Sequence, residues 1–335
     1  MNPTDFAYSL TRYLSHYLPG LRNLSPNTVL AYRDMFKLMI RFAEVERKIS
    51  PEKLTLSAID AVFVEDFLAW LEATQGSSIA TRNQRLAAIH AFFQYLQREK
   101  PEMMVQCQQI IAIKMKKTSK PTVNYLKVDI IKQLLAVPDT NDKFGFRDSV
   151  LLGLLYDTGS RVSEIIELRP LDLHLKTPAS VSVTGKGRKT RQCPISLTLA
   201  ENITAYLEVW GLTASERAGS PLFVNHKGEK ISRAGVTYIL KKYMRAIKDA
   251  PPKVSPHVLR HSKAVHLLEA GVNLVYIRDQ LGHEKITSTQ VYLKTNPEMR
   301  RAAFAKAART LPEQEKSPAW IADNNLLNYL NSLGK

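Results

Sequence analysis

The chain has 335 residues, 44% of them hydrophobic and 23% charged, which excludes a disordered chain, collagen and a coiled coil. It has no run of about 18 apolar residues to span a membrane. Its two cysteines, Cys107 and Cys193, fit neither a disulfide framework nor a zinc-binding spacing. The net charge of +16 favours a polyanionic partner, most often a nucleic acid.

Residues 1–117 predict a helical bundle without strands. The helical patterns cover Phe6–Leu18, a segment from Pro26 to Val45, Ala61 or Val62 to Leu71, and Ile79–Leu96 after a cap at Ser77 or Ser78. The polar face of the last helix carries Thr81, Arg82, Asn83 and Arg85. These side chains can bind DNA phosphates or base edges, although an ordinary solvated helix face explains them equally well.

A basic segment without apolar periodicity follows the bundle. It runs from Ile113 to Asn124 and contains Pro121, and we interpret residues 118–124 as an inter-domain linker. Lys116 and Lys117 lie at its start and are candidates for contacts with a DNA backbone that passes between the domains.

Residues 125–316 predict a second, mixed domain. The segment 118–315 has a net charge of +11, against +4 for residues 1–117, so the excess charge is concentrated there. Two strands, 180–184 and 191–195, flank a turn at Gly185–Arg188. Helices are expected at 127–135, 146–156, 161–168, 196–207, 232–245, 255–270, 274–281 and 287–292. The predicted fold is mainly α with a small antiparallel β-sheet in the second domain.

Residues 317–335 predict a short amphipathic helix with few charges. Trp320, Leu327 and Leu330 share one stripe. The stripe could pack on its own domain, or it could be exchanged with a neighbouring protomer.

Five short motifs follow one another in the second domain. They are Thr158–Glu164, Gly185-Lys186-Gly187, His257–Ser262, Leu281-Gly282-His283 and Tyr292. In this order they resemble the tyrosine recombinases, also called the tyrosine integrase family. Ser25–Tyr32 and Thr81–Phe93 are similar to that family's N-terminal core-binding domain. The resemblance covers nearly the whole chain and implies a Xer-like pair of a helical core-binding domain and an α+β catalytic domain.

The implied chemistry breaks a DNA phosphodiester without hydrolysis. A tyrosine oxygen attacks phosphorus and stores the bond as a 3′-phosphotyrosyl ester, and the freed hydroxyl of another strand later reverses the step. Two arginines can stabilise the negatively charged phosphorane with bidentate hydrogen bonds. This chemistry needs no metal, and the sequence has no metal-ligand cluster of defined spacing. No cofactor is expected.

The resemblance also assigns the residues. Arg161 and Arg260 are the expected phosphate-binding arginines, and Tyr292 is the expected nucleophile. His257 lies three residues before Arg260, on the same helix face, and is the expected general acid or base.

Three further residues complete the expected site. Lys186 is the expected general acid for the departing 5′-hydroxyl, His283 a supporting phosphate contact, and Glu164 a supporting residue that orients the site. Arg188, Lys189 and Arg191 lie close enough to compete with Lys186, and Arg188 and Lys189 are also predicted to bind DNA.

Two aromatic residues near the motifs are interpreted as outside the chemistry. His261 directly follows Arg260 and is interpreted as structural. Tyr276 comes too early in the sequence to be the nucleophile, because it falls inside the helix that precedes His283.

The predicted function is site-specific DNA recombination in integration, excision, resolution or transposition. Type IB topoisomerase chemistry and a DNA-binding regulator without catalysis are the alternatives, and residues 270–281 do look like part of a helix-turn-helix. The expected partner is double-stranded DNA at an inverted-repeat site, bound by a dimer and joined in a tetramer, with the need for an accessory protein left open. Without a secretory signal, the expected location is the cytoplasm, in association with the nucleoid.

Overall fold

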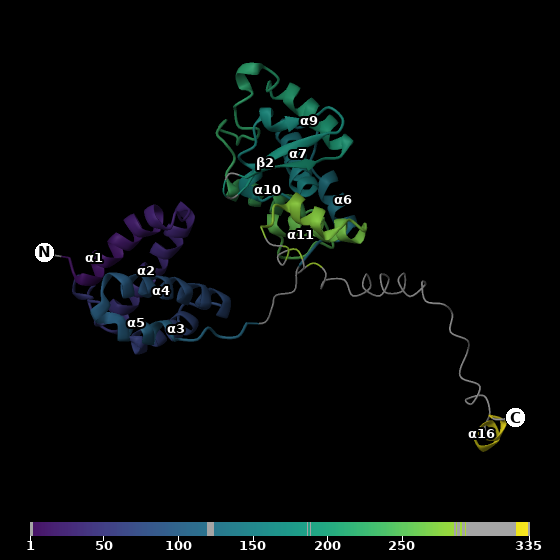
Figure 1. Ribbon diagram of the computed structural model, residues 1–335. Coiled ribbons are helices and arrows are strands. Elements are labelled where there is room, and N and C mark those ends of the chain that lie inside the picture. The colour runs from purple at the N-terminus through teal and green to yellow at the C-terminus, as the bar shows by residue number, and fades with distance from the viewer. Residues whose placement is uncertain are drawn as a thin grey trace. The chain divides into compact units, whose positions relative to one another are not determined.

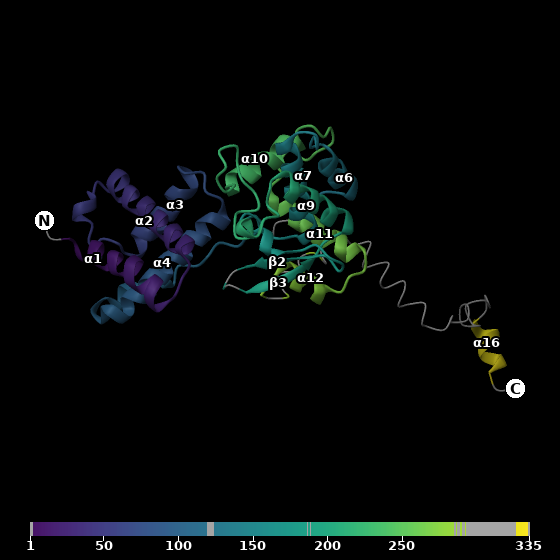
Figure 2. The ribbon, with the colours of Figure 1, turned by 90° about the horizontal axis from the view of Figure 1, so that it is seen from above.

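The computed structural model describes residues 3–118, 124–185, 187, 189–284, 286, 289, 292 and 326–333. The chain divides into two compact units, residues 1–121 and residues 122–335, called here the N-terminal and C-terminal units. The division falls inside the segment 118–124 that the sequence predicts as a linker. Each unit is drawn in Figure 1 and, from above, in Figure 2.

The N-terminal unit is helical, as predicted. Its α-helices are α1 (Asp5–Arg12), α2 (Pro26–Glu46), α3 (Ala61–Ala73), α4 (Ile79–Glu99) and α5 (Met104–Ile111). Ser25 and Ser78 cap α2 and α4, because each side chain accepts a hydrogen bond from the backbone N–H three residues on. The aromatic residues Tyr13, Phe36, Phe92 and Phe93 lie at the centre of its core.

Two features of this unit differ from the prediction. The pattern at Phe6–Leu18 divides into α1 and a π-helical segment, Tyr13–Leu21, that contains Pro19. The helix α5 was missed, because its apolar stripe is short and interrupted by glutamines. Its buried residues Cys107 and Ile110 complete the same core.

The C-terminal unit combines helices with one small sheet, which confirms the predicted fold class. Its helices are α6 (Val128–Ala136), α7 (Lys143–Thr158), α8 (Val162–Ile165), α9 (Leu197–Val209), α10 (Arg233–Met244), α11 (Pro256–Glu269), α12 (Leu274–Leu281) and α16 (Leu326–Ser332). The described helices therefore follow the predicted order, with ends shifted by a few residues. Most of the predicted helix 287–292 lies outside the described residues, as does 317–325 of the predicted tail helix.

The sheet has three antiparallel strands in the order β1 (Leu173–His174), β2 (Ser180–Thr184) and β3 (Thr190–Pro194). The two-residue strand β1 was not predicted. Val181 pairs with Cys193, and both side chains are buried against the core. The β2–β3 hairpin lies beside α12 in Figure 2. The hairpin therefore presents its turn near the end of α12.

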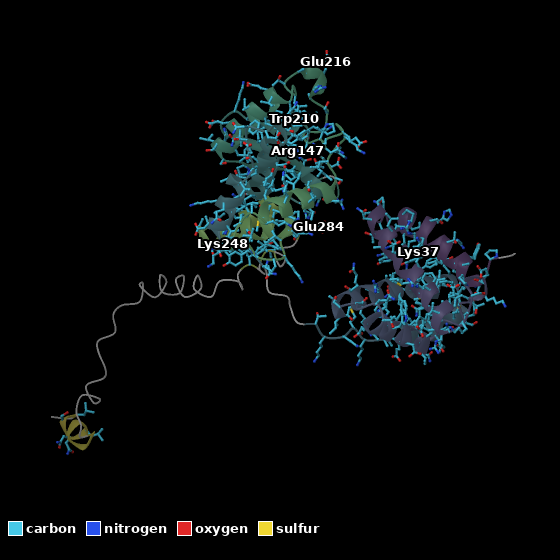
Figure 3. All side chains as sticks on the ribbon, turned by 180° about the vertical axis from the view of Figure 1, so that it is seen from behind. Lys37, Arg147, Trp210, Glu216, Lys248 and Glu284 are labelled. Carbon is cyan, nitrogen blue, oxygen red and sulfur yellow. The ribbon has the colours of Figure 1, made fainter. Side chains whose placement is uncertain are left out.

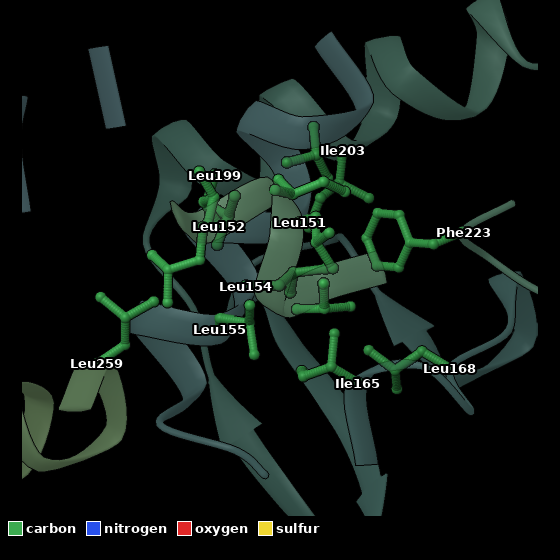
Figure 4. Close-up of a cluster of buried hydrophobic side chains, with 14 of the residues drawn as sticks. Leu151, Leu152, Leu154, Leu155, Ile165, Leu168, Leu199, Ile203, Phe223 and Leu259 are labelled. Carbon is green, nitrogen blue, oxygen red and sulfur yellow. The ribbon is translucent and has the colours of Figure 1, made fainter. Parts of the chain in front are cut away.

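The core of the C-terminal unit surrounds α7. Figure 4 shows the leucines of α7 packed among Phe223, Ile203 of α9, and Leu259, which belongs to α11. Arg147, labelled in Figure 3, and Asp148 form a buried ion pair on α7. The Tyr243 hydroxyl of α10 donates a hydrogen bond to Asp148. This packing fixes the end of α7, where the first predicted motif begins.

Among the described residues, no helix is long and apolar enough to cross a membrane.

Candidate active site

The first motif begins where α7 ends. Gly159 adopts a left-handed conformation with φ of +58°, which closes the helix and turns the chain into α8. Arg161 caps α8. Its backbone N–H donates to Glu164 Oε2 at 2.9 Å, and its Nη1 donates to Glu164 Oε1 at 2.9 Å. The turn therefore holds Arg161 by its backbone and its side chain at once.

Glu164 is the buried centre of an arginine cluster. The residue is 5% exposed, and Arg191 Nη2 of β3 donates to its Oε2 at 2.8 Å. Burial alone would raise the pKa of this carboxyl group, but hydrogen bonds from Arg191 and Arg161 outweigh burial and lower the pKa. Glu164 thus stays ionised and bridges two guanidinium groups.

The second arginine of the predicted pair comes from α11. Arg260 is 3% exposed, and its Nη1 and Nη2 donate to the carbonyl oxygens of Gly159 at 2.9 Å and Leu281 at 2.7 Å. Burial, followed by the charge of Arg161, lowers the pKa of Arg260 to about 10, so the guanidinium remains charged at neutral pH. Its orientation is fixed before any phosphate arrives.

The predicted nucleophile is buried beside a histidine. Tyr292 is 2% exposed and belongs to a small apolar cluster with Val265, Ile277 and Leu281. Its hydroxyl shares a 2.8 Å hydrogen bond with His261 Nδ1, whereas His257 is exposed on α11. Burial raises the pKa of Tyr292, and the nearby Arg260 and Arg161 lower it in part.

The interpretation of His261 as structural missed its contact with Tyr292. The sequence signal was present, because His261 is adjacent to Arg260. His257 and His261 lie one helical turn apart, however, and the sequence does not show which of them contacts Tyr292, about 30 residues later.

His283 directly follows the left-handed Gly282 that ends α12. Its Nδ1 is 2.9 Å from Thr289 Oγ1, and its ring lies parallel to that of Tyr292 at a centroid distance of 6.4 Å. Burial, then the charges of Arg260 and Arg161, lower the pKa of His283 to about 4. The imidazole is therefore neutral at pH 7.

We expect this histidine to make the folded state sensitive to acid. Between its ordinary pKa of 6.5 and about 4, His283 is protonated in the unfolded chain but neutral in the folded chain. The unfolded state then binds more protons, so stability decreases as the pH falls through this window. In thermal unfolding at pH 7 to 4, His283→Gln should show a smaller loss of Tm than wild type. An equally steep loss would contradict this role.

An open cavity of about 780 Å³ lies at this cluster. Its lining includes Arg161, Gly185, Lys189, Arg191, Arg278 and His283. The turn between β2 and β3 borders it, and the Gly185 N–H donates to the Lys189 carbonyl at 2.9 Å. Lys186 and Arg188 lie outside the described residues. Four of the remaining predicted catalytic residues are brought together: Arg161, Arg260, His283 and Tyr292.

The predicted DNA-binding residues of the N-terminal unit fall into two groups. Thr81 and Arg85 line an open cavity of about 480 Å³ between α2 and α4. Arg82 is instead 6% exposed, lies 3.5 Å from a Glu72 carboxylate oxygen and donates to the Lys114 carbonyl. Its guanidinium therefore has partners within its own unit.

Hydrogen bonds between Asn83 of α4 and Lys116 hold the segment that follows α5 against α4. The Asn83 side chain donates to the Lys116 carbonyl at 2.8 Å and accepts from its backbone N–H at 3.1 Å. Lys116 Nζ contacts both Glu72 carboxylate oxygens, at 2.8 and 2.9 Å, while Lys117 is exposed. Contact of these residues with DNA stays a prediction.

No group of three or more His, Cys, Asp or Glu residues that could hold a metal ion occurs within the described ranges.

Comparison with known proteins places the chain in a family. The phage integrase family matches residues 124–299, and the phage integrase N-terminal SAM-like domain matches residues 10–100. The protein y4rC of Sinorhizobium fredii, named as an integrase/recombinase, is 39% identical over 317 residues, which are 93% of each chain. Tyrosine recombinase XerC of Pelotomaculum thermopropionicum is 33% identical over 297 residues, covering 87% of this chain and 95% of the relative.

A solved structure shows the same fold. The Tn1549 transposon integrase in complex with transposon right end DNA aligns with a TM-score of 0.68 at 17% identity, covering 90% of this chain and 99% of that chain.

The two matched domains and the relatives define an enzyme that cleaves and rejoins DNA. The chain belongs to the phage integrase family, that is, to the tyrosine recombinases, whose activity is site-specific recombination.

Proposed function

We propose that this recombinase cleaves one DNA strand through Tyr292, on a phosphate held by Arg161 and Arg260. The observation that carries the proposal is the convergence of these residues. Arg260 binds the carbonyl of Gly159, two residues before Arg161, and the carbonyl of Leu281, two residues before His283. The Arg260 guanidinium thus links the segment that carries Arg161 to the segment that carries His283, the other two candidates for binding the phosphate.

The proposed chemical step gives each of these residues a role. The Tyr292 oxygen forms a bond to phosphorus, and the bond from phosphorus to the 5′-oxygen breaks. The two guanidinium groups stabilise the negative charge that develops on the non-bridging oxygens. The Tyr292 hydroxyl gives its proton to His257, which acts as general base in cleavage and as general acid in rejoining. Lys186 donates the proton that the departing 5′-oxygen takes up. Rejoining reverses each bond change.

DNA must reposition the nucleophile. In the DNA-free chain, the Tyr292 hydroxyl is buried and shares a hydrogen bond with His261. His261 is itself neutral at pH 7, because burial and the neighbouring His257 and Arg260 lower its pKa. We therefore infer that the hydroxyl exchanges His261 for the phosphate when DNA fills the cavity.

The partner is double-stranded DNA with an inverted-repeat site. Arg82 is the one buried residue among the described candidates. The others are partly or fully exposed: Thr81, Asn83, Arg85, Lys116 and Lys117 of the N-terminal unit and Lys189 of the C-terminal unit. Arg82, Asn83 and Lys116 are retained as candidates that would first exchange their internal partners. Two copies bind each site and four form the synaptic complex, at the nucleoid in the cytoplasm.

The tail supplies the contact between copies in this proposal. The described helix α16 exposes Leu330 and, just beyond its end, Leu333. A neighbouring copy of the chain would cover this apolar side.

The test is a covalent adduct on nicked DNA. A duplex from the region that flanks this gene, nicked next to the cleavage position, loses the short 5′-hydroxyl fragment and so traps the intermediate. We expect a protein–DNA band on a denaturing gel, formed equally in EDTA. Protease digestion and mass spectrometry should find the nucleotide on the peptide that contains Tyr292. A modified peptide elsewhere, or specific binding without any adduct, would contradict the proposal.

A further inference from the structure

Arg191 is a largely buried arginine for which the proposed reaction has no role. It lies on β3, and its side chain is 14% exposed. Its Nη2 donates to Glu164 Oε2 at 2.8 Å and to Ser160 Oγ at 3.2 Å, and its Nε donates to the Gln280 carbonyl at 2.7 Å. One guanidinium therefore binds two segments that are more than 100 residues apart in the sequence.

The contact with Glu164 leads directly to a phosphate-binding candidate. Glu164 uses Oε1 for the Arg161 guanidinium, and it shares Oε2 between the Arg161 backbone and Arg191. Without Arg191, Oε2 would lose its only side-chain cation among the described contacts. A buried carboxylate that loses such a partner reorients or draws in water. The direction of Arg161 would change with it.

The other contacts of Arg191 lie next to His283 and to the β2–β3 turn. Gln280 lies three residues before His283, at the end of α12. A Cβ atom at Gly282 would lie 2.8 Å from Arg191 Nη1, and one at Gly185 would lie 3.4 Å from the same atom. The guanidinium thus packs against the backbone on both sides of the cavity, beside the residue that precedes Lys186.

We propose that Arg191 is a positioning residue that aims Arg161 and His283 at the scissile phosphate. The inference rests on the proposed function and deepens it, because Arg191 acts through Glu164 and the end of α12. A lysine would keep the charge but could not bond the Gln280 carbonyl and Glu164 together, since it lacks the planar fork of arginine. The alternative is that Arg191 serves only to stabilise the fold.

The test compares Arg191→Lys with wild type and with a control on the same strand. Gln192→Ala is the control, because Gln192 is exposed and its amide bonds Ser182 on the other side of the hairpin. The single-turnover rate of adduct formation is measured at saturating protein on two nicked duplexes. One has the native phosphate at the scissile position, and the other has a neutral methylphosphonate. The Kd and the Tm are measured for each variant.

We expect Arg191→Lys to cleave native DNA about 10²-fold more slowly, the size of a small misplacement of reacting groups, with a Kd within about threefold of wild type. On methylphosphonate the defect should shrink to less than about tenfold, because one negative charge that Arg161 stabilises is gone. The variant with both Arg191→Lys and Glu164→Gln should be no slower than the slower single variant, because both substitutions break the same contact between Arg191 and Glu164.

Three outcomes would overturn the inference. They are a rate equal to that of Gln192→Ala, an equal defect on both substrates, and additive defects in the double variant. Arg191→Lys could unfold at the assay temperature. In that case the Arg191→Gln and Glu164→Gln double variant, which removes both members of this ion pair together, replaces it in the substrate comparison. An absence of adduct with wild-type protein on native DNA would instead count against the proposed function.

Discussion

Replacing Tyr292 with phenylalanine is expected to abolish the covalent adduct completely and to leave DNA binding within about threefold of wild type. Phenylalanine has no oxygen to attack phosphorus. The aromatic ring still fills the cluster of Val265, Ile277 and Leu281. The hydrogen bond to His261 is lost, which should change the free energy of unfolding by about 1 kcal/mol.

Tyr276→Phe is the matched control for this measurement. Tyr276 lies on α12 in the same unit and is exposed. Its variant should form the adduct at the wild-type rate. Adduct formation by Tyr292→Phe, or its loss in Tyr276→Phe, would assign the nucleophile to another residue.

Arg260→Lys should slow adduct formation by at least about 10²-fold to 10³-fold, which is about 3 kcal/mol or more of barrier. The guanidinium bonds two carbonyl oxygens with two of its nitrogens and still has an edge to offer a phosphate. A lysine ammonium cannot bond the Gly159 and Leu281 carbonyls and a phosphate in the same geometry. The rate is measured under single-turnover conditions with saturating protein, so that weaker binding does not contribute.

Arg169→Lys provides the comparison. Arg169 pairs with Asp172 three residues later, as Arg161 pairs with Glu164, but it is exposed and lies outside the cavity. Its variant should cleave at the wild-type rate. A loss of rate in Arg260→Lys that is fully explained by a lower folded fraction, measured by circular dichroism at the assay temperature, would remove the case for transition-state stabilisation.

The order of the helices and the grouping of Arg161, Arg260, His283 and Tyr292 could be predicted from the sequence. Periodicity and capping residues such as Ser25 and Ser78 mark helix starts, because they satisfy free backbone N–H groups locally. The grouping came from the order of motifs in a known family. Spacing alone gives no distance between Gly159 and Arg260, which are 101 residues apart.

Side-chain partners across elements could not be predicted in this way. Arg82 and Arg85 lie on one helix, but tertiary packing places Arg82 against Glu72 and leaves Arg85 at an open cavity. Arg191 was considered only as a competitor of Lys186. Its inward direction depends on strand register, where a shift of one residue would bring Gln192 to the buried side instead.

The two carbonyls that accept hydrogen bonds from Arg260 also determine when the site can be completed during synthesis of the chain. The Gly159 carbonyl leaves the ribosome before the arginine does, and the Leu281 carbonyl leaves it 21 residues after. Domains generally fold as units during synthesis, so the arginine is anchored on both sides only after residue 281 has emerged, and Tyr292 emerges later still. A nascent chain that stops before residue 281 lacks the Leu281 carbonyl and also lacks Tyr292, the proposed nucleophile. We therefore expect an incomplete chain to leave DNA uncut, because it lacks both the second contact that orients Arg260 and the proposed nucleophile.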